Sequence, residues 1–226
     1  MAYINPLLSK GLNWRILLVF LISVPLTLWA IIMSLFFGKS RLQHQKAIRK
    51  LLKLVLSKIS ISTYNDKALA SGTPFIIAAN HIDHFDWMAL YSVLETDVCV
   101  VTDKFFSGFP FSLLTRNAGF FTLRQKASFG QSRDILRILN AVKERSSMLI
   151  FVNTAADSND LLPNIKPGAA YLSIKSGAPV LPVRIKGSEG GNSLYIVFGK
   201  PLFPDTDDIS KAGEFTNRIR DSILSL

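Results

Sequence analysis

The sequence predicts an α/β fold, a mixed β-sheet flanked by helices, preceded by a helical segment that anchors the chain in a membrane. Three observations favour this fold class. A stretch without any charged residue extends from residue 16 to residue 37. In the rest of the chain, short apolar runs alternate with segments of helical periodicity, which is typical of α/β proteins. The 226 residues suffice for one mid-sized domain and a short appendage.

The N-terminal stretch from Ile16 to Phe37 reads ILLVFLISVPLTLWAIIMSLFF. It has the ~20 apolar residues that a helix needs to cross a bilayer core. Pro25 lies in its middle and is compatible with a helix that spans the membrane and with one that turns back within a leaflet. The run is longer than the apolar region of a cleaved signal peptide and is not followed by a clean cleavage motif, so we interpret it as an anchor.

Basic residues dominate the segment that follows the anchor: Lys39, Arg41, Lys46, Arg49, Lys50, Lys53 and Lys58. The positive-inside rule therefore places the C-terminal side of the anchor in the cytoplasm. Apolar residues between Leu42 and Ile59 recur at helical spacing and predict a basic amphipathic helix. Such a helix can lie on an anionic leaflet or pack its apolar face on the next domain, and the two arrangements are compatible. We assign residues 1–60 to the anchor and this helix, and residues 61–226 to the α/β domain.

The α/β domain is expected to open with the polar stretch at residues 65–74. Apolar runs predict strands at 75–79, 98–101, 148–152, 180–185 and 194–198, and helical periodicity predicts helices at 87–94, 132–142, 169–175 and 215–224. Gly177 is expected to cap the third helix. Cys99, the single cysteine, lies in an apolar run and is interpreted as a core residue. The net charge of +10 suits an anionic partner; the apolar anchor favours a membrane surface, and no nucleic-acid motif is present.

The candidate catalytic residues lie in the segment NHIDHFDW, directly after the predicted strand at 75–79. This segment holds two of the three histidines. An imidazole accepts a hydroxyl proton near neutral pH, and a carboxylate on its other nitrogen fixes the tautomer. His81 and Asp86 have a spacing that a tight turn into a helix would close. The alternatives are a structural histidine at a helix start, or a metal site that adds Asp83 and His84. Zinc requires at least three well-placed ligands, so we predict no metal.

The segment from Asn80 to Asp86 resembles the Asn-His-x-x-x-x-Asp signature of the glycerolipid acyltransferase family, which includes the 1-acylglycerol-3-phosphate acyltransferases. Further blocks are similar and follow in the same order, namely residues 104–110, GFFTLR at 119–124, and residues 165–188 with VLPV at 180–183. The resemblance covers roughly residues 74–201 in addition to the anchor. It implies a glycerophosphate acyltransferase-like fold for residues 61–226 and a role in phospholipid biosynthesis.

The resemblance also implies a direct transfer reaction. His81 would be the general base on a hydroxyl of a lysophospholipid or related lipid acceptor, with Asp86 orienting it. The acyl donor would be an acyl-CoA or an acyl carrier protein, and no cofactor or metal would be needed. Asn80, Lys104 and Arg124 are expected to contact substrate.

One block departs from the family pattern Phe-Pro-Glu-Gly-Thr-Arg-Ser, because residues 151–158 read FVNTAADS. The Glu, Gly and Arg of the pattern are replaced by Asn153, Thr154 and Ala156. Losing the cation that holds an acceptor phosphate would cost on the order of 2–5 kcal/mol of binding free energy. We therefore expect an acceptor other than lysophosphatidic acid, with Asn153, Thr154 and Ser158 bonded to a neutral or zwitterionic head group. The alternative is a catalytically degenerate membrane protein that only binds lipid or acyl chains.

Overall fold

The computed structural model describes residues 40–66, 69, 72–82, 86–102, 118–122, 133–154, 162, 165–187 and 193–226. The predicted anchor at residues 16–37 lies outside these ranges. Within them, none of the helices combines the length and the apolar character required to traverse a bilayer.

A single seven-stranded sheet with the order β1-β7-β6-β2-β5-β3-β4 forms the centre of the described structure. Its strands are β1 (Ser60–Tyr64), β2 (Ile76–Ala79), β3 (Val98–Thr102), β4 (Phe120–Thr122), β5 (Ser147–Phe151), β6 (Val180–Gly187) and β7 (Ser193–Phe198). All neighbouring strands are parallel except β6 and β7, which are antiparallel. The mixed sheet is thus confirmed, while the sequence did not predict the edge strands β1 and β4.

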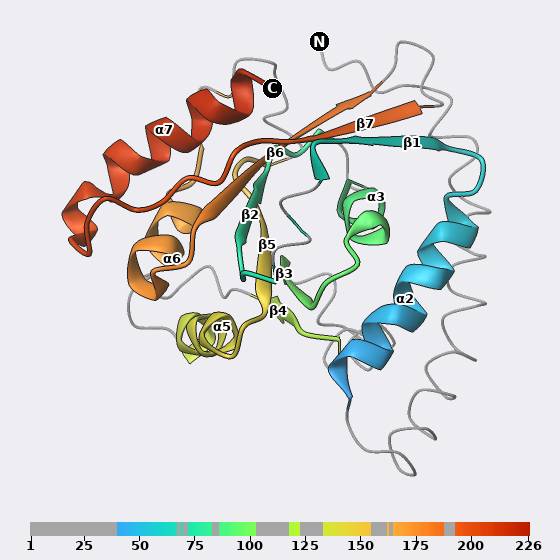
Figure 1. Ribbon diagram of the computed structural model, residues 1–226, viewed down its shortest axis with the longest axis horizontal. Coiled ribbons are helices and arrows are strands. Elements are labelled where there is room, and N and C mark those ends of the chain that lie inside the picture. Colours follow the sequence, from blue (N-terminus) through green and yellow to red (C-terminus); the bar gives the residue numbers. More distant parts are fainter. Residues whose placement is uncertain are drawn as a thin grey trace.

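Helices cover both faces of this sheet, as Figure 1 shows: α2 and α3 lie on one side, and α5, α6 and α7 on the other. Their bounds are α2 (Arg41–Val55), α3 (Asp86–Val93), α5 (Arg133–Lys143), α6 (Gly168–Ser176) and α7 (Ala212–Leu224), with a short 3-10 helix, η4 (Ile209–Lys211), before α7. Gly177 ends α6 as predicted, with a φ of 72° and its N–H donating to the Ser173 carbonyl at 2.8 Å. Positive φ at this position favours glycine.

Two hydrophobic cores fill the spaces between the sheet and its two helical layers. In β2, Ile76 and Ala78 belong to the core beneath α5–α7, whereas Ile77 and Ala79 belong to the core beneath α2 and α3. All four side chains are completely buried. A central parallel strand covered on both faces requires a continuous apolar run, which explains why the sequence predicted this strand.

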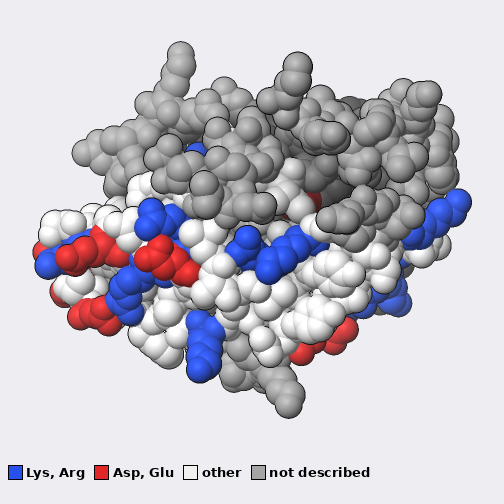
Figure 2. Space-filling model, turned by 90° about the horizontal axis from the view of Figure 1, so that it is seen from above, with Lys and Arg blue, Asp and Glu red and all other residues white. Residues whose placement is uncertain are grey.

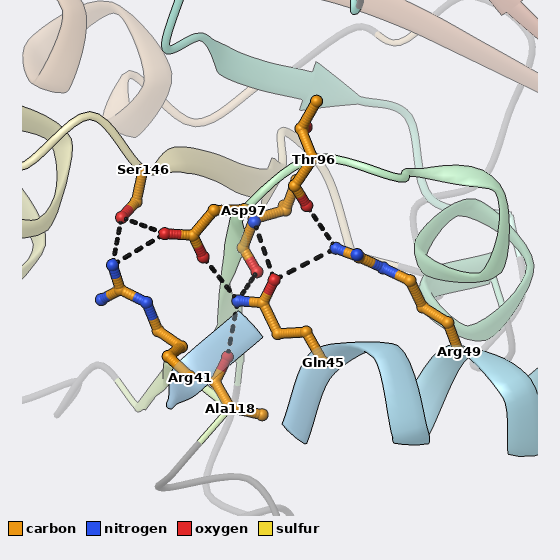
Figure 3. A network of polar contacts seen from close by, with 8 residues as sticks. Arg41, Gln45, Arg49, Thr96, Asp97, Ala118 and Ser146 are labelled. Carbon is orange, nitrogen blue, oxygen red and sulfur yellow. Dashed lines mark hydrogen bonds and ion pairs between the residues drawn. The ribbon is translucent and has the colours of Figure 1, made fainter. Parts of the chain in front are cut away.

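The inward face of α2 is polar in its first half, where the hydrogen bonds of Figure 3 join it to the domain, and apolar further on, where Leu52 is buried in the core beneath α2 and α3. Gln45 is fully buried, and its Nε2 donates to Asp97 Oδ1 at 2.8 Å and to the Val98 carbonyl at 3.0 Å. Arg41 forms an ion pair with the other carboxylate oxygen of Asp97 at 2.8 Å. Burial lowers the pKa of the Arg49 guanidinium, which donates to backbone carbonyls at the end of the α3–β3 loop. Of the two arrangements considered for this helix, packing on the domain is therefore realised.

The outward face of α2 and the turn after it exposes four lysines and two leucines, here called the lysine face: Leu42, Lys46, Lys50, Lys53, Leu54 and Lys58. Leu54 has 63% of its surface exposed. Figure 2 shows cationic side chains at the right-hand edge, the side on which Figure 1 places α2, whereas cationic and anionic side chains are mixed at the left, near α7. These side chains are thus exposed although α2 is packed on the domain. The domain boundary at residue 60 stays a prediction.

Candidate active site

The carboxyl ends of the parallel strands β2, β5, β3 and β4 meet at one edge of the sheet, and the candidate site residues follow these ends. His81 is the second residue after β2, and Asn153 is the second residue after β5. Lys104 and Arg124 follow β3 and β4 at the same interval along the chain, but both lie outside the described residues. Open α/β sheets bind their ligands outside the carboxyl ends of their strands. This edge is therefore the candidate active site.

The structure brings His81 and Asp86 into direct contact. Asp86 is the first residue of α3, and its Oδ2 lies 3.0 Å from Nδ1 of His81. The same oxygen accepts a hydrogen bond from the backbone N–H of Ile82 at 2.6 Å. An ionised carboxylate can only accept, so in a neutral imidazole bonded to it Nδ1 would carry the ring proton and Nε2 the lone pair.

Packing holds the imidazole of His81 in a defined orientation. Its ring stacks on Phe151 of β5, with the centroids 4.3 Å apart and the planes inclined by 21°. The His81 side chain is 17% exposed, whereas that of Asp86 is 1% exposed. An acid buried behind a partly accessible imidazole is the arrangement needed for general base catalysis on an entering hydroxyl group.

Asn153 contacts the main chain of His81 rather than its ring. The carboxamide oxygen of Asn153 accepts from the His81 N–H at 2.7 Å, and its Nδ2 donates to the His81 carbonyl at 2.8 Å. Nδ2 also donates to the carbonyl of Thr154 at 3.0 Å. The sequence had suggested Asn153 only as a head-group contact, which stays a prediction. The contact with His81 was not foreseen, because the two residues come from different strands.

Asn80 has a comparable arrangement on the other side of β2. Its Nδ2 donates to the carbonyl of Ile185 at 3.0 Å, and its Oδ1 accepts from the N–H of the same residue at 2.6 Å. The amide of Asn80 thereby joins the end of β2 to β6. Its expected contact with substrate stays a prediction, and the same is true of Thr154, the last described residue before position 162.

Several other candidates lie outside the described residues, namely Asp83, His84, Lys104, Arg124 and Ser158. In the ranges that the structure does describe, no group of three His, Cys, Asp or Glu side chains is placed to hold a metal ion. Cys99 is completely buried in β3, as predicted. Burial raises the pKa of its thiol to about 11, so the thiol is protonated at neutral pH and is a poor nucleophile.

Comparison with known proteins identifies the family of the chain. Residues 60–186 match the model of the family described as Acyltransferase. The chain belongs to the acyltransferase family. The matched segment begins at β1, includes His81, Asp86 and Asn153, and ends within β6.

Individual relatives of this acyltransferase family member were found in sequence and in structure. Human 1-acyl-sn-glycerol-3-phosphate acyltransferase beta is 32% identical over 124 residues, which are 52% of this chain and 43% of that protein. The alignment thus spans less than half the length of this relative. The crystal structure of the 1-acyl-sn-glycerophosphate (LPA) acyltransferase PlsC from Thermotoga maritima superposes with a TM-score of 0.73, covering 96% of each chain at 15% identity. This similarity confirms the fold predicted for the α/β domain.

Proposed function

We propose that this protein is a membrane-bound O-acyltransferase that moves a fatty acyl group from acyl-CoA or acyl carrier protein to a hydroxyl of a lysophospholipid or related lipid. The observation that carries the proposal is the contact between His81 Nδ1 and Asp86 Oδ2 at the carboxyl edge of the sheet. Membership of the acyltransferase family supports the same reaction class.

In the proposed reaction, Nε2 of His81 takes the proton of the acceptor hydroxyl while the oxygen attacks the thioester carbonyl carbon. Asp86 stabilises the imidazolium that forms, as its Oδ2 already accepts the proton on Nδ1. Collapse of the tetrahedral oxyanion breaks the carbon–sulfur bond and expels a thiolate. The imidazolium returns its proton to that sulfur, so the products are an ester and a free thiol. Neither a metal nor a cofactor enters this balance.

The acceptor that we propose carries a neutral or zwitterionic head group in place of a phosphate monoester. Positions 153, 154 and 156 hold Asn, Thr and Ala, so none of them supplies a cation. Asp157 adds a negative charge to the same segment. A phosphate dianion at this block would lack the cation of the family pattern and would meet the charge of Asp157, which leaves Lys104 and Arg124 as the possible anion contacts.

The protein would work at the cytoplasmic face of a membrane, held by the anchor at residues 16–37 and by the lysine face of α2. The hydrogen bonds of Gln45 and Arg41 keep α2 on the domain, which presents the lysines outward. Anionic leaflets attract such a surface by about 1 kcal/mol for each lysine near the lipid. The cations that follow the anchor support this orientation.

The test is the release of free thiol from acyl-CoA or acyl carrier protein by the full chain in detergent, with a panel of lipid acceptors. The wild type is expected to release thiol with at least one acceptor, and His81→Ala is expected to abolish the release. His44→Ala is the matched control, because His44 lies on α2 away from the site. If the wild type binds acyl chains but releases no thiol with any acceptor, the protein is the degenerate lipid-binding relative.

The acceptor proposal has a separate test. Thr154→Gly combined with Ala156→Arg restores the Gly and the Arg of the family pattern, while Asn153 keeps its contact with the main chain of His81. This double variant is expected to raise the rate with lysophosphatidic acid relative to the neutral acceptors. Efficient use of lysophosphatidic acid by the unmodified protein would contradict the proposed preference.

A further inference from the structure

We infer that Asn153 is a positioning residue, which fixes the main chain of His81 and through it the imidazole that acts as the base. This inference rests on the proposed function, since it presupposes that His81 takes the acceptor proton. It assigns to the divergent family block a role inside the catalytic framework, instead of a role in holding the head group.

The register of the sheet shows what the side chain replaces. Strands β2 and β5 pair in parallel from Ile76 opposite Met148 to Ala79 opposite Phe151. The ladder ends with the N–H of Val152 donating to the carbonyl of Ala79 at 3.0 Å. Continuing this register places Asn153 opposite His81.

Beyond the last hydrogen bond between the two backbones, the carboxamide of Asn153 pairs with the backbone of His81 as a neighbouring strand would. It accepts from the N–H of His81 at 2.7 Å and donates to the carbonyl of His81 at 2.8 Å. Both polar groups of the His81 peptide backbone are thus satisfied by one planar amide, as they would be by a β-strand.

Only an amide of this length provides the complete set of bonds. A carboxylate has no donor and would face the carbonyl oxygen of His81, while alanine supplies neither donor nor acceptor. The two hydrogens of Nδ2 are both engaged, with the carbonyls of His81 and Thr154. Asn153 is 5% exposed, so this amide belongs to the interior of the site.

The effect on the imidazole follows from the neighbouring contacts. The His81 N–H is held by Asn153 and the next N–H, that of Ile82, is held by Asp86 Oδ2. The ring itself is bonded to the same carboxylate oxygen and stacked on Phe151, two residues before Asn153. Releasing the first restraint lets the segment move away from β5, and a displacement of about 1 Å can lower a catalytic rate ~100-fold.

The experiment compares Asn153→Ala and Asn153→Asp with Ser147→Ala in the full chain. Ser147 is a matched control, because its buried Oγ accepts from the N–H of Phe75 at 3.1 Å and joins the same two strands at their opposite ends. For both Asn153 variants, kcat for thiol release is expected to fall about 10- to 100-fold, with the KM for the acceptor within about twofold of the wild-type value. Ser147→Ala is expected to keep the wild-type kcat even if its melting temperature falls. Asn153→Asp retains the acceptor for the His81 N–H and serves if the alanine variant does not fold.

A second readout does not depend on turnover. Diethyl pyrocarbonate modifies accessible neutral imidazoles, and peptide mass spectrometry reports the rate at each histidine. The rate at His81 is expected to rise several-fold in the Asn153 variants, while the rate at His44 stays as in the wild type and Ser147→Ala changes neither.

The possible outcomes separate the two proposals. A raised acceptor KM with an unchanged kcat and an unchanged modification rate at His81 would show that Asn153 contacts the head group, which overturns the inference. Equal losses of kcat in Asn153→Ala and Ser147→Ala would reduce its role to general stability and also overturn it. Full activity of His81→Ala would instead remove the proposed function.

Discussion

Replacing Asp86 by asparagine isolates the contribution of its charge to the proposed base. In the folded chain, one carboxylate oxygen accepts from both His81 Nδ1 and the Ile82 N–H. An asparagine is expected to place its single carbonyl oxygen at the same position, because its NH2 group would otherwise face the Ile82 N–H, and two donors repel each other. Both hydrogen bonds and the tautomer of His81 are therefore retained in Asp86→Asn, and only the negative charge is lost.

The expected magnitude follows from this difference. Hydrogen bonds to a charged group contribute about 1.5–3 kcal/mol, against about 0.5–1.5 kcal/mol for neutral pairs. The imidazolium formed during proton transfer would thus be stabilised by about 1.3 kcal/mol less, which corresponds to roughly a tenfold loss of kcat. Asp86→Ala removes both bonds and leaves the partly buried N–H of Ile82 without this acceptor, so a loss of about 100-fold or more is expected together with lower stability.

The assay is thiol release at saturating donor and acceptor, with circular dichroism to confirm that each variant is folded. The reasoning requires the order wild type, then Asp86→Asn, then Asp86→Ala in decreasing kcat. A folded Asp86→Ala variant with the wild-type kcat would refute it, because the imidazole would then need no acid behind it.

Three further predictions concern the parts of the structure that support the site. Gln45→Leu removes the buried hydrogen bonds to Asp97 and Val98. This variant is expected to lower the free energy of unfolding by about 2–4 kcal/mol in urea titrations. Gln43→Leu, on the exposed face of α2, should change the free energy of unfolding little. Burial raises the pKa of Cys99 from 9.0 to about 11, so the unfolded chain loses this proton first and stability should fall as the pH rises between these values. Cys99→Ala should abolish that part of the pH dependence, and an identical profile in the variant would contradict the assignment. Changing Lys46, Lys50, Lys53 and Lys58 to Gln should weaken binding to phosphatidylserine-containing vesicles more than tenfold relative to neutral vesicles. The control substitutions are at Lys143 and Lys175, which are exposed on the opposite helical layer. Equal effects of both sets would argue against a role of the lysine face in membrane binding.

Local pattern was sufficient to predict most of the regular structure. The central strand β2 and the helices α3 and α6 appear within one or two residues of their predicted bounds, because continuous apolar runs and helical periodicity report directly on burial. The edge strand β1 was missed since its residues, SISTY, are only partly buried and show no apolar run. The short strand β4 lies in a stretch without a distinct strand pattern of its own.

The proposed dyad was accessible to sequence reasoning for a similar reason. His81 and Asp86 are close along the chain, and a strand end leading into a helix start closes the distance between them by local geometry alone. The role of Asn153 was not accessible in this way. An asparagine after a strand is common, and its partner depends on which strand lies alongside.

The sequence by itself determined the α/β class, the burial of β2, the acid–imidazole pair and the amphipathic character of α2. Only the tertiary structure decided what connects these parts: the contact of Asn153 with His81 across 72 positions of the chain, that of Asn80 with Ile185 across 105, and the packing of Gln45 against Asp97. The physical reason is that strand order is set by the packing of whole layers on one sheet. Hydrogen bonds between distant residues exist only after that packing has placed the strands side by side.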